Sequence, residues 1–148
     1  MNNPATIPAV QPTSPALRTR RAPAVVRILL GLPFAIFGLN SFLNFIPQPE
    51  TPLPEGAVAF SMALLNSGYM MPLIGITQLI PGLMLLTNRF VPLALVLLAP
   101  FLVNALAFHL FLEPGGRIVT GVFVGLELYL LLAYRACYRP MLAARAAP

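Results

Sequence analysis

Few side chains in this sequence could carry out chemistry, and Glu127 stands in the most unusual setting of them. It lies in the middle of the apolar run 118–138. A carboxyl group at the centre of a membrane helix costs about 2.5–3.5 kcal/mol on insertion scales, and it usually faces a partner or water. We therefore expect Glu127 to handle a proton or a ligand. The alternative is that it only hydrogen-bonds to another helix and fixes the packing.

Gln78 is the second polar side chain that stands deep in an apolar run. It lies near the middle of residues 69–87, on the helical face that it shares with Gly75 and Gly82. Glycines on such a face allow another backbone to approach closely. Because Gln78 and Glu127 stand at matching depths, we expect a direct hydrogen bond between them.

Three further amides and one histidine lie toward the predicted outer ends of the apolar runs. They are Asn40, Asn44, Asn104 and His109. Their related depths, together with Gln78 and Glu127, predict a polar ligand-binding pocket that opens outward. Each amide alone could instead hold two helices together. His109 could anchor the chain at the membrane interface or exchange a proton with a ligand.

The residue types exclude several kinds of site. There is one cysteine, Cys137, and one histidine, so the chain can form neither an internal disulfide nor a CxxC pair. A zinc site needs three or four protein ligands. We therefore predict no catalytic residue and no metal site, and we expect no cofactor held covalently or by metal ligation. Which cofactor acts with the protein, if any, stays open.

The composition places the chain in a lipid bilayer. Of 148 residues, 58% are hydrophobic and 9% are charged, and the mean hydropathy is +0.83. A soluble domain carries about 25% charged residues to cover its surface. The net charge of +5 comes with nine scattered arginines and no lysine. Nucleic acid is not an expected partner, because these arginines form no basic cluster interleaved with aromatic residues.

Four apolar runs predict an all-α integral membrane four-helix bundle. The runs cover residues 25–46, 69–87, 90–112 and 118–138. Each is near the roughly 20 residues that a membrane-spanning helix needs, and none alternates as a barrel strand would. Residues 57–66 predict a short interfacial helix between helices one and two. Residues 1–24 are expected to form a disordered, proline-rich cytoplasmic tail, residues 25–140 the membrane domain, and residues 141–148 a second cytoplasmic tail.

The arginines predict the orientation of the helices. Eight of the nine fall on one side of the four runs, and these are Arg18, Arg20, Arg21, Arg27, Arg89, Arg135, Arg139 and Arg145. Loops rich in basic residues stay in the cytoplasm. Both termini are therefore expected to be cytoplasmic, in a multi-pass protein. Gly121 and Gly125 form a GxxxG motif that could pack a helix of the same bundle or of a second copy.

The order of these motifs resembles the DoxX family of small bacterial membrane proteins. The residues that carry the resemblance are RILLGLPFAIFGLNSF (27–42), the segment 68–112 from GYMMPLIG to FHLFL, and YRACYRPML (134–142). The resemblance implies a compact four-helix bundle in the bacterial inner membrane. Some members are associated with oxidation of thiosulfate or other sulfur compounds coupled to quinone, and with thiol redox homeostasis. Many members have a glutamate in place of Gln78, and an amide cannot titrate.

Two functions follow as hypotheses. The first is an accessory membrane subunit that binds a quinone or a small sulfur or thiol species, with a redox partner protein supplying electrons that this chain cannot hold. The second is a non-enzymatic small-molecule transporter or membrane scaffold. In either case we do not expect the isolated chain to be an enzyme.

Overall fold

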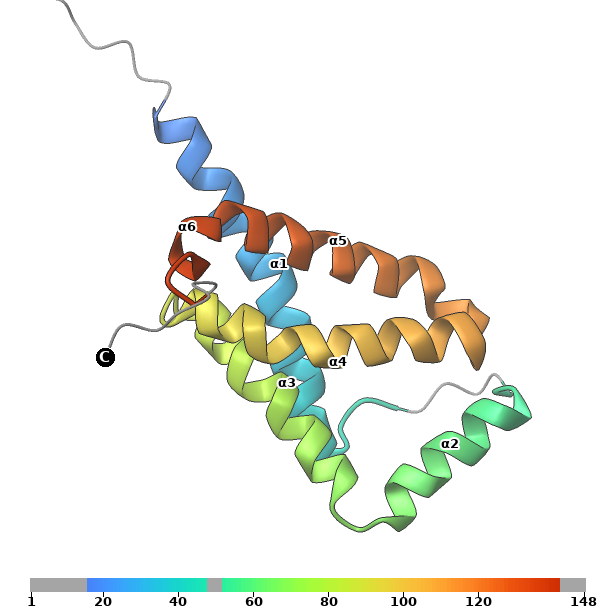
Figure 1. The fold of residues 1–148 in the computed structure, drawn as a ribbon. Helices are drawn as coiled ribbons and strands as arrows, with labels where there is room; N and C mark the ends of the chain where they lie inside the picture. Colours follow the sequence, from blue (N-terminus) through green and yellow to red (C-terminus); the bar gives the residue numbers. More distant parts are fainter. Residues whose placement is uncertain (1–15, 48–51, 142–148) are drawn as a thin grey trace, which may run out of the picture.

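The computed structural model describes residues 16–47 and 52–141, and the described residues form helices and turns without a strand. The long helices are α1 (Ala16–Leu43), α3 (Met70–Leu86), α4 (Val91–Phe111) and α5 (Arg117–Ala133). They contact one another in the order α1–α3–α4–α5, and α5 also contacts α1. The shorter elements are α2 (Glu55–Asn66), η1 (Pro114–Gly116) and α6 (Arg135–Tyr138). Figure 1 shows the four long helices together and α2 set apart from them.

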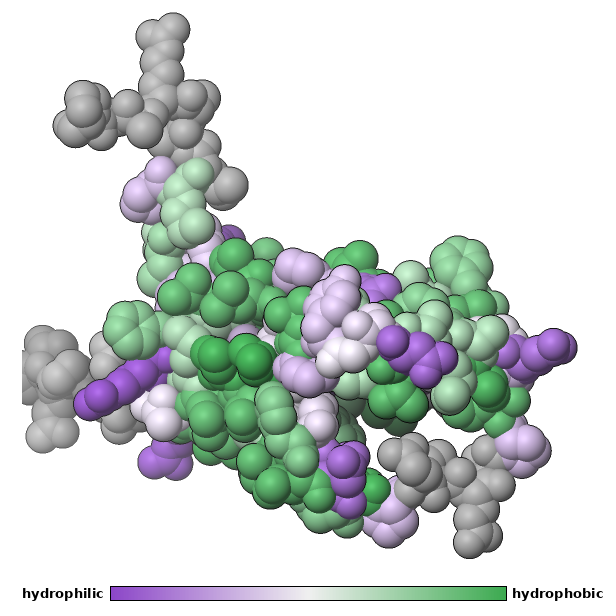
Figure 2. Space-filling view, turned by 90° about the horizontal axis from the view of Figure 1, so that it is seen from below, coloured by the Kyte–Doolittle hydropathy of each residue, from purple (hydrophilic) through white to green (hydrophobic). Residues whose placement is uncertain are grey.

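The surface of this bundle is apolar, as a lipid-facing surface must be. Three helical segments are long and apolar enough to cross a membrane: Arg21–Leu43, Val91–Phe111 and Pro114–Ala133. Helices α2 and α3 together meet the same criterion, but they are bent by 93° at their junction. Figure 2 shows apolar side chains over much of the visible face. The prediction of an all-α membrane bundle with an extra short helix between the first two long helices is confirmed.

Helix boundaries differ from the sequence-based prediction at several places. Helix α1 begins at Ala16, inside the predicted tail 1–24, and alanine, leucine and arginine in this stretch are good helix formers. The rest of that tail, residues 1–15, and most of the predicted tail 141–148 lie outside the described residues. The last long helix ends at Ala133 instead of 138, because the backbone leaves the helical conformation at Tyr134 and α6 begins after it.

Helices α1 and α3 are in close contact at four glycines, and three of them lie against the backbone of the opposite helix. A Cβ atom at Gly38 would lie 2.7 Å from the Cα of Leu79, and one at Gly82 would lie 2.9 Å from the Cα of Ala35. Gly31 and Gly75 are packed as closely against the opposite helix. Real Cβ atoms essentially never approach another atom to less than 3.0 Å. The predicted close approach at Gly75 and Gly82 is thus present, and it draws Gln78 between them into the bundle.

Two hydrogen bonds join the helix ends that carry most of the arginines. The Arg27 guanidinium on α1 donates to the Asn88 side chain in the turn between α3 and α4. The Tyr138 hydroxyl on α6 donates to the carbonyl of Pro92 at 3.1 Å. The start of the bundle part of α1, the α3–α4 turn and α6 therefore lie at one end, which we call the arginine end. Figure 1 shows α2 and the α4–α5 connection at the opposite end.

The GxxxG motif faces away from the rest of the bundle. Gly121 and Gly125 are both exposed, and no atom lies within 4 Å of a Cβ built on either one. None of the described helices packs on this face of α5. A contact with a second copy of the chain stays a prediction.

The packed glycines of the α1–α3 contact and the exposed glycines of α5 allow a matched test of that contact. We expect Gly82→Ala to lower the free energy of unfolding by about 1–3 kcal/mol, because the added methyl group forces the two backbones apart. Gly125→Ala adds the same methyl group in open space, and it should leave the stability unchanged or raise it by up to about 1 kcal/mol through helix propensity. Unfolding in mixed detergent micelles, followed by circular dichroism, measures both. Equal effects of the two substitutions would contradict the close contact.

Candidate functional site

A cavity of about 350 Å³ lies among α1, α3, α4 and α5. Four phenylalanines from three helices are among its wall residues: Phe34, Phe37, Phe101 and Phe123. The polar groups at its wall are few, namely Gln78, His109 and Thr120. We call it the aromatic cavity. Ligand sites are typically apolar hollows of about 300–1,000 Å³ with a small number of placed polar groups, and this cavity has that character.

A second cavity, of about 270 Å³, adjoins the first beneath α2. The two share Gln78, Phe101, Ala105 and His109 as wall residues. Helix α2 closes one side of this lateral cavity with Phe60, Ser61 and Leu64. Asn104 also lines it, although the Asn104 side chain is largely exposed. Three of the predicted site residues, Gln78, Asn104 and His109, are therefore brought together.

Gln78 is a polar wall residue of both cavities, and it lies on the tightly packed helix α3. It is 7% exposed, and its amide atoms are not among the fully buried side-chain atoms that lack a partner. The amide of Gln78 is therefore free to donate to or accept from a molecule in either cavity.

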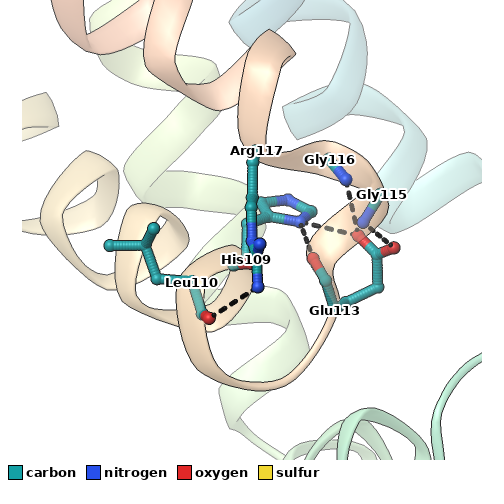
Figure 3. Close-up of polar contacts among 6 residues, drawn as sticks. All are labelled: His109, Leu110, Glu113, Gly115, Gly116 and Arg117. Carbon is teal, nitrogen blue, oxygen red and sulfur yellow. Dashed lines mark hydrogen bonds and ion pairs between the residues drawn. The ribbon is translucent and has the colours of Figure 1, made fainter.

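His109 is held by the connection between α4 and α5 (Figure 3). Its Nδ1 lies 2.7 Å from a carboxylate oxygen of Glu113, one helical turn further on. The same carboxylate accepts hydrogen bonds from the backbone N–H groups of Gly115 at 2.7 Å and Gly116 at 3.0 Å. A Cβ atom at Gly116 would overlap the His109 ring, so the ring packs directly on this glycine. We call residues 109–117 the α4–α5 corner.

The charges of this corner are locally balanced. Burial raises the pKa of Glu113, but hydrogen bonds from Gly116, Gly115 and His109 outweigh it, so the pKa lies below its ordinary value of 4.5. Glu113 is thus a carboxylate at neutral pH. Arg117 donates from Nε to the carbonyl of His109 at 3.1 Å and from a terminal nitrogen to the carbonyl of Leu110 at 3.2 Å. The arginine therefore caps the end of α4 and does not pair with Glu113.

Glu127 is buried, but it lines neither of these cavities. It is 3% exposed, and neither carboxyl oxygen has a hydrogen-bond partner among the described residues. The predicted hydrogen bond between Gln78 and Glu127 is therefore wrong. The reason is the order of the helices: α3 and α5 are at diagonal positions of the bundle, with α1 and α4 between them.

Asn40 and Asn44 also lie apart from the aromatic cavity. They line a separate hollow of about 600 Å³ between the end of α1 and α2. Asn40 accepts a hydrogen bond from the backbone N–H of Ile46 at 2.8 Å. Asn44 has a positive φ of 49°, directly after the last residue of α1, which is a common position for asparagine at a helix C-terminus. Both amides therefore terminate α1, and the predicted single pocket is divided.

Sequence reasoning did not single out Glu113 or the phenylalanine wall as parts of a site. The signal for Glu113 was its spacing of four residues from His109, followed by the turn-forming PGG. No signal marked the phenylalanines, because Phe34, Phe101 and Phe123 stand in runs where most residues are equally apolar.

An α-helical membrane protein with a ligand-sized cavity between its helices is the class that this fold defines. A comparison with protein-family models matches DoxX over residues 22–110. The match covers more than half of the chain, and the protein belongs to the DoxX family. The matched part includes Gln78, Asn104 and His109 but ends before Glu113 and α5. The comparisons with curated proteins and with solved structures gave no match.

Because the carboxyl oxygens of Glu127 are buried without a hydrogen-bond partner, a substitution can test whether this residue stabilises the fold. We expect Glu127→Met to raise the free energy of unfolding by about 1–3 kcal/mol, because a buried polar group without a hydrogen bond is replaced by an apolar one of similar size. Leu126→Met, at the neighbouring and partly buried position, is the control and should lower stability by less than about 1.5 kcal/mol. Unfolding in mixed micelles measures both. A clear loss of stability in Glu127→Met would mean that the carboxyl group has a stabilising partner.

Proposed function

We propose that this DoxX-family protein binds a quinone in the aromatic cavity and serves as an accessory membrane subunit of a redox system. The observation that carries the proposal is the composition of the cavity wall, in which four phenylalanines occur together with Gln78 and His109. Aromatic rings pack well on a flat ring at offset or edge-on angles. The two polar groups can hydrogen-bond to the ring's oxygens, and a lipid tail can leave toward the bilayer.

The same wall argues against a small sulfur oxyanion or a thiol as the ligand of this cavity. An anion in an apolar cavity needs a cation beside it. Arg117 is the nearest arginine along the chain to His109, but it does not line the aromatic cavity, and two of its five N–H donors bond to the backbone carbonyls of His109 and Leu110. Cys137 is exposed, and it follows α5 at the arginine end, far along the chain from the cavity residues. A neutral, ring-shaped ligand therefore fits better than a charged sulfur species.

Electrons would have to come from a partner protein. The chain offers a single cysteine and a single histidine, which suit neither dithiol exchange nor a haem bound between two histidines. In this proposal the isolated chain binds quinone without turning it over, and a separate redox protein reduces or oxidises the bound ring.

The proposed location is the bacterial inner membrane, with four crossings and both termini in the cytoplasm. The arginine end gathers Arg27, Arg89, Arg135 and Arg139, and positive charge is retained on the cytoplasmic side. With α2 and α3 counted as one bent span, the crossings number four. The α4–α5 corner then faces the periplasm.

The exposed GxxxG face of α5 supports a further proposal, a homo-oligomer formed through Gly121 and Gly125. Small residues on an open helix face let two membrane helices approach closely. An assembly of this kind would also suit the alternative function, a non-enzymatic scaffold or transporter.

Binding of a short-chain ubiquinone to the purified protein in detergent, measured by isothermal titration calorimetry, tests the quinone proposal. We expect saturable binding and about tenfold weaker binding for Gln78→Leu, because one hydrogen bond is lost and its partner is left unpaired. Thr77→Val is the matched control on the same helix. The Thr77 hydroxyl donates to the carbonyl of Ile74 in its own helix, and Thr77 lines neither cavity.

The outcomes separate the functions. Saturable binding of quinone that Gln78→Leu weakens and Thr77→Val preserves supports the proposal. Binding of thiosulfate without binding of quinone would overturn it in favour of a sulfur ligand. Binding of neither would leave the transporter or scaffold function.

A further inference from the structure

The lateral cavity lies next to the aromatic cavity on the α3–α4 side of the bundle. The wall residues that the two hollows share come from these two helices, and they are Gln78, Phe101, Ala105 and His109. A molecule whose ring occupies the aromatic cavity beside Gln78 therefore has the lateral cavity as its neighbouring space.

The rest of the lateral cavity wall is mostly apolar and carries no charge. Beyond the shared residues, its apolar members are Phe60, Leu64, Met71, Ile74 and Phe108, and its polar members are Ser61 and Asn104. A charged group placed there would lose its hydration and find no counter-charge. A hollow of about 270 Å³ with this wall therefore suits a hydrocarbon group.

Helix α2 covers the lateral cavity with one face, and its opposite face is apolar as well. On the covering face, the Phe60 ring packs on that of Phe108 in α4, with the ring centroids 5.7 Å apart. Ala57 on the same face is fully buried. On the outer face, Val58 is 43% exposed and Leu65 is 54% exposed. A helix that is apolar on both faces lies among lipid chains when it belongs to a membrane protein. The lateral cavity is thus one helix away from the hydrocarbon of the bilayer.

The junction between α2 and α3 holds α2 in this covering position. The two helices meet at 93°, and Figure 1 shows α2 leaving the line of α3 there. Gly68 in the junction has a φ of 76°, which glycine adopts without strain. The Ser67 hydroxyl donates to the carbonyl of Leu64 at 2.6 Å and accepts from the N–H of Met70 at 3.1 Å. One side chain therefore links the end of α2 to the start of α3.

We propose that the lateral cavity holds the hydrocarbon tail of the ligand whose ring lies in the aromatic cavity. This inference rests on the proposed quinone binding. It defines the ligand class as a lipid-soluble ring with a tail, and it makes α2 the cover between that tail and the surrounding lipid. The shared wall at Gln78 and Ala105 is then where the ring ends and the tail begins.

The other side on which a tail could leave the aromatic cavity is formed by α1 and α5. Phe37 and Val119 line the cavity there and are 47% and 58% exposed. A tail that left between them would lie directly in lipid, with little protein around it. The lateral cavity instead offers walls from α2, α3 and α4, so a tail in it gains packing contacts that lipid alone does not hold in place.

The same substitution at two neighbouring residues tests the placement of the tail. Leu64→Trp enlarges a side chain that lines the lateral cavity but not the aromatic one. Leu65→Trp is the control, because Leu65 is exposed and lines neither cavity. Calorimetry measures the dissociation constants of a short-chain ubiquinone and of the same ring without a tail, for the natural protein and both variants. Each ligand is compared across the three proteins in one detergent, so that its partition into micelles cancels.

The expected result is a loss that depends on the tail. Leu64→Trp should weaken binding of the tailed quinone by about tenfold, because the indole occupies the space of the tail. Its affinity for the tail-free ring should change by less than about twofold. Leu65→Trp should leave both affinities within about twofold of those of the natural protein.

A second measurement uses the natural protein alone. A ubiquinone analogue with a diazirine at the end of a short tail is bound and irradiated, and the labelled peptides are identified by mass spectrometry. We expect the labels in α2 and in the parts of α3 and α4 that face it, residues 71–74 and 104–108. Excess ubiquinone without the diazirine should suppress them.

The outcomes distinguish this inference from the proposed function. A tail-dependent loss in Leu64→Trp together with labels beneath α2 supports the inference. Equal weakening of both ligands by Leu64→Trp, no weakening of either, or labels confined to α1 and α5 overturns the inference and leaves quinone binding standing. Failure of the natural protein to bind the tailed quinone overturns both. Because the labelling needs no variant, it decides the matter even if Leu64→Trp does not fold.

Discussion

The backbone contact between α1 and α3 is the constraint on which the rest of the structure depends. Inside a bilayer, helices gain no hydrophobic free energy by associating, so close van der Waals packing must hold them together. Glycines spaced seven residues apart on each helix, Gly31 and Gly38 against Gly75 and Gly82, provide it. The contact also fixes the rotation of α3. Gln78, between the two glycines of α3, is thereby turned into the bundle beside Phe34 and Phe101.

The α4–α5 corner fixes the opposite wall of the cavity. The residues 112–116 join the two helices, so α5 returns along α4 almost at once. Glu113 accepts the N–H groups of Gly115 and Gly116 and binds His109 with the same carboxylate. One side chain therefore closes the turn and orients the imidazole. Since Thr120 lies in the first turn of α5, it reaches the same cavity as His109.

The sequence was sufficient to predict where the helices lie, but it was insufficient to predict which polar side chains meet. Long apolar runs have one stable arrangement in lipid, so the four long helices and α2 were predictable from hydropathy. Depth in the membrane was predictable too, but the direction of a side chain around the helix bundle was not. The sequence predicts similar depths for Gln78 and Glu127, yet they belong to helices on a diagonal. Asn40 and Asn44 looked like site residues, although they terminate α1.

The separation of Glu127 from His109 bears on which group can exchange protons with water. Glu127 lies ten residues along α5 from Arg117, or about 15 Å, and the residue is 3% exposed, with both carboxyl oxygens buried. His109 is 25% exposed and lies at the end of a helix, beside a charged turn. His109 therefore lies at the cavity wall and within reach of the water outside the corner. Glu127 lies near Leu130 and Phe123 of its own helix, which belong to the apolar core or pack against it, and both of its carboxyl oxygens are buried. Of the two groups, the histidine at the corner is the one that water can reach.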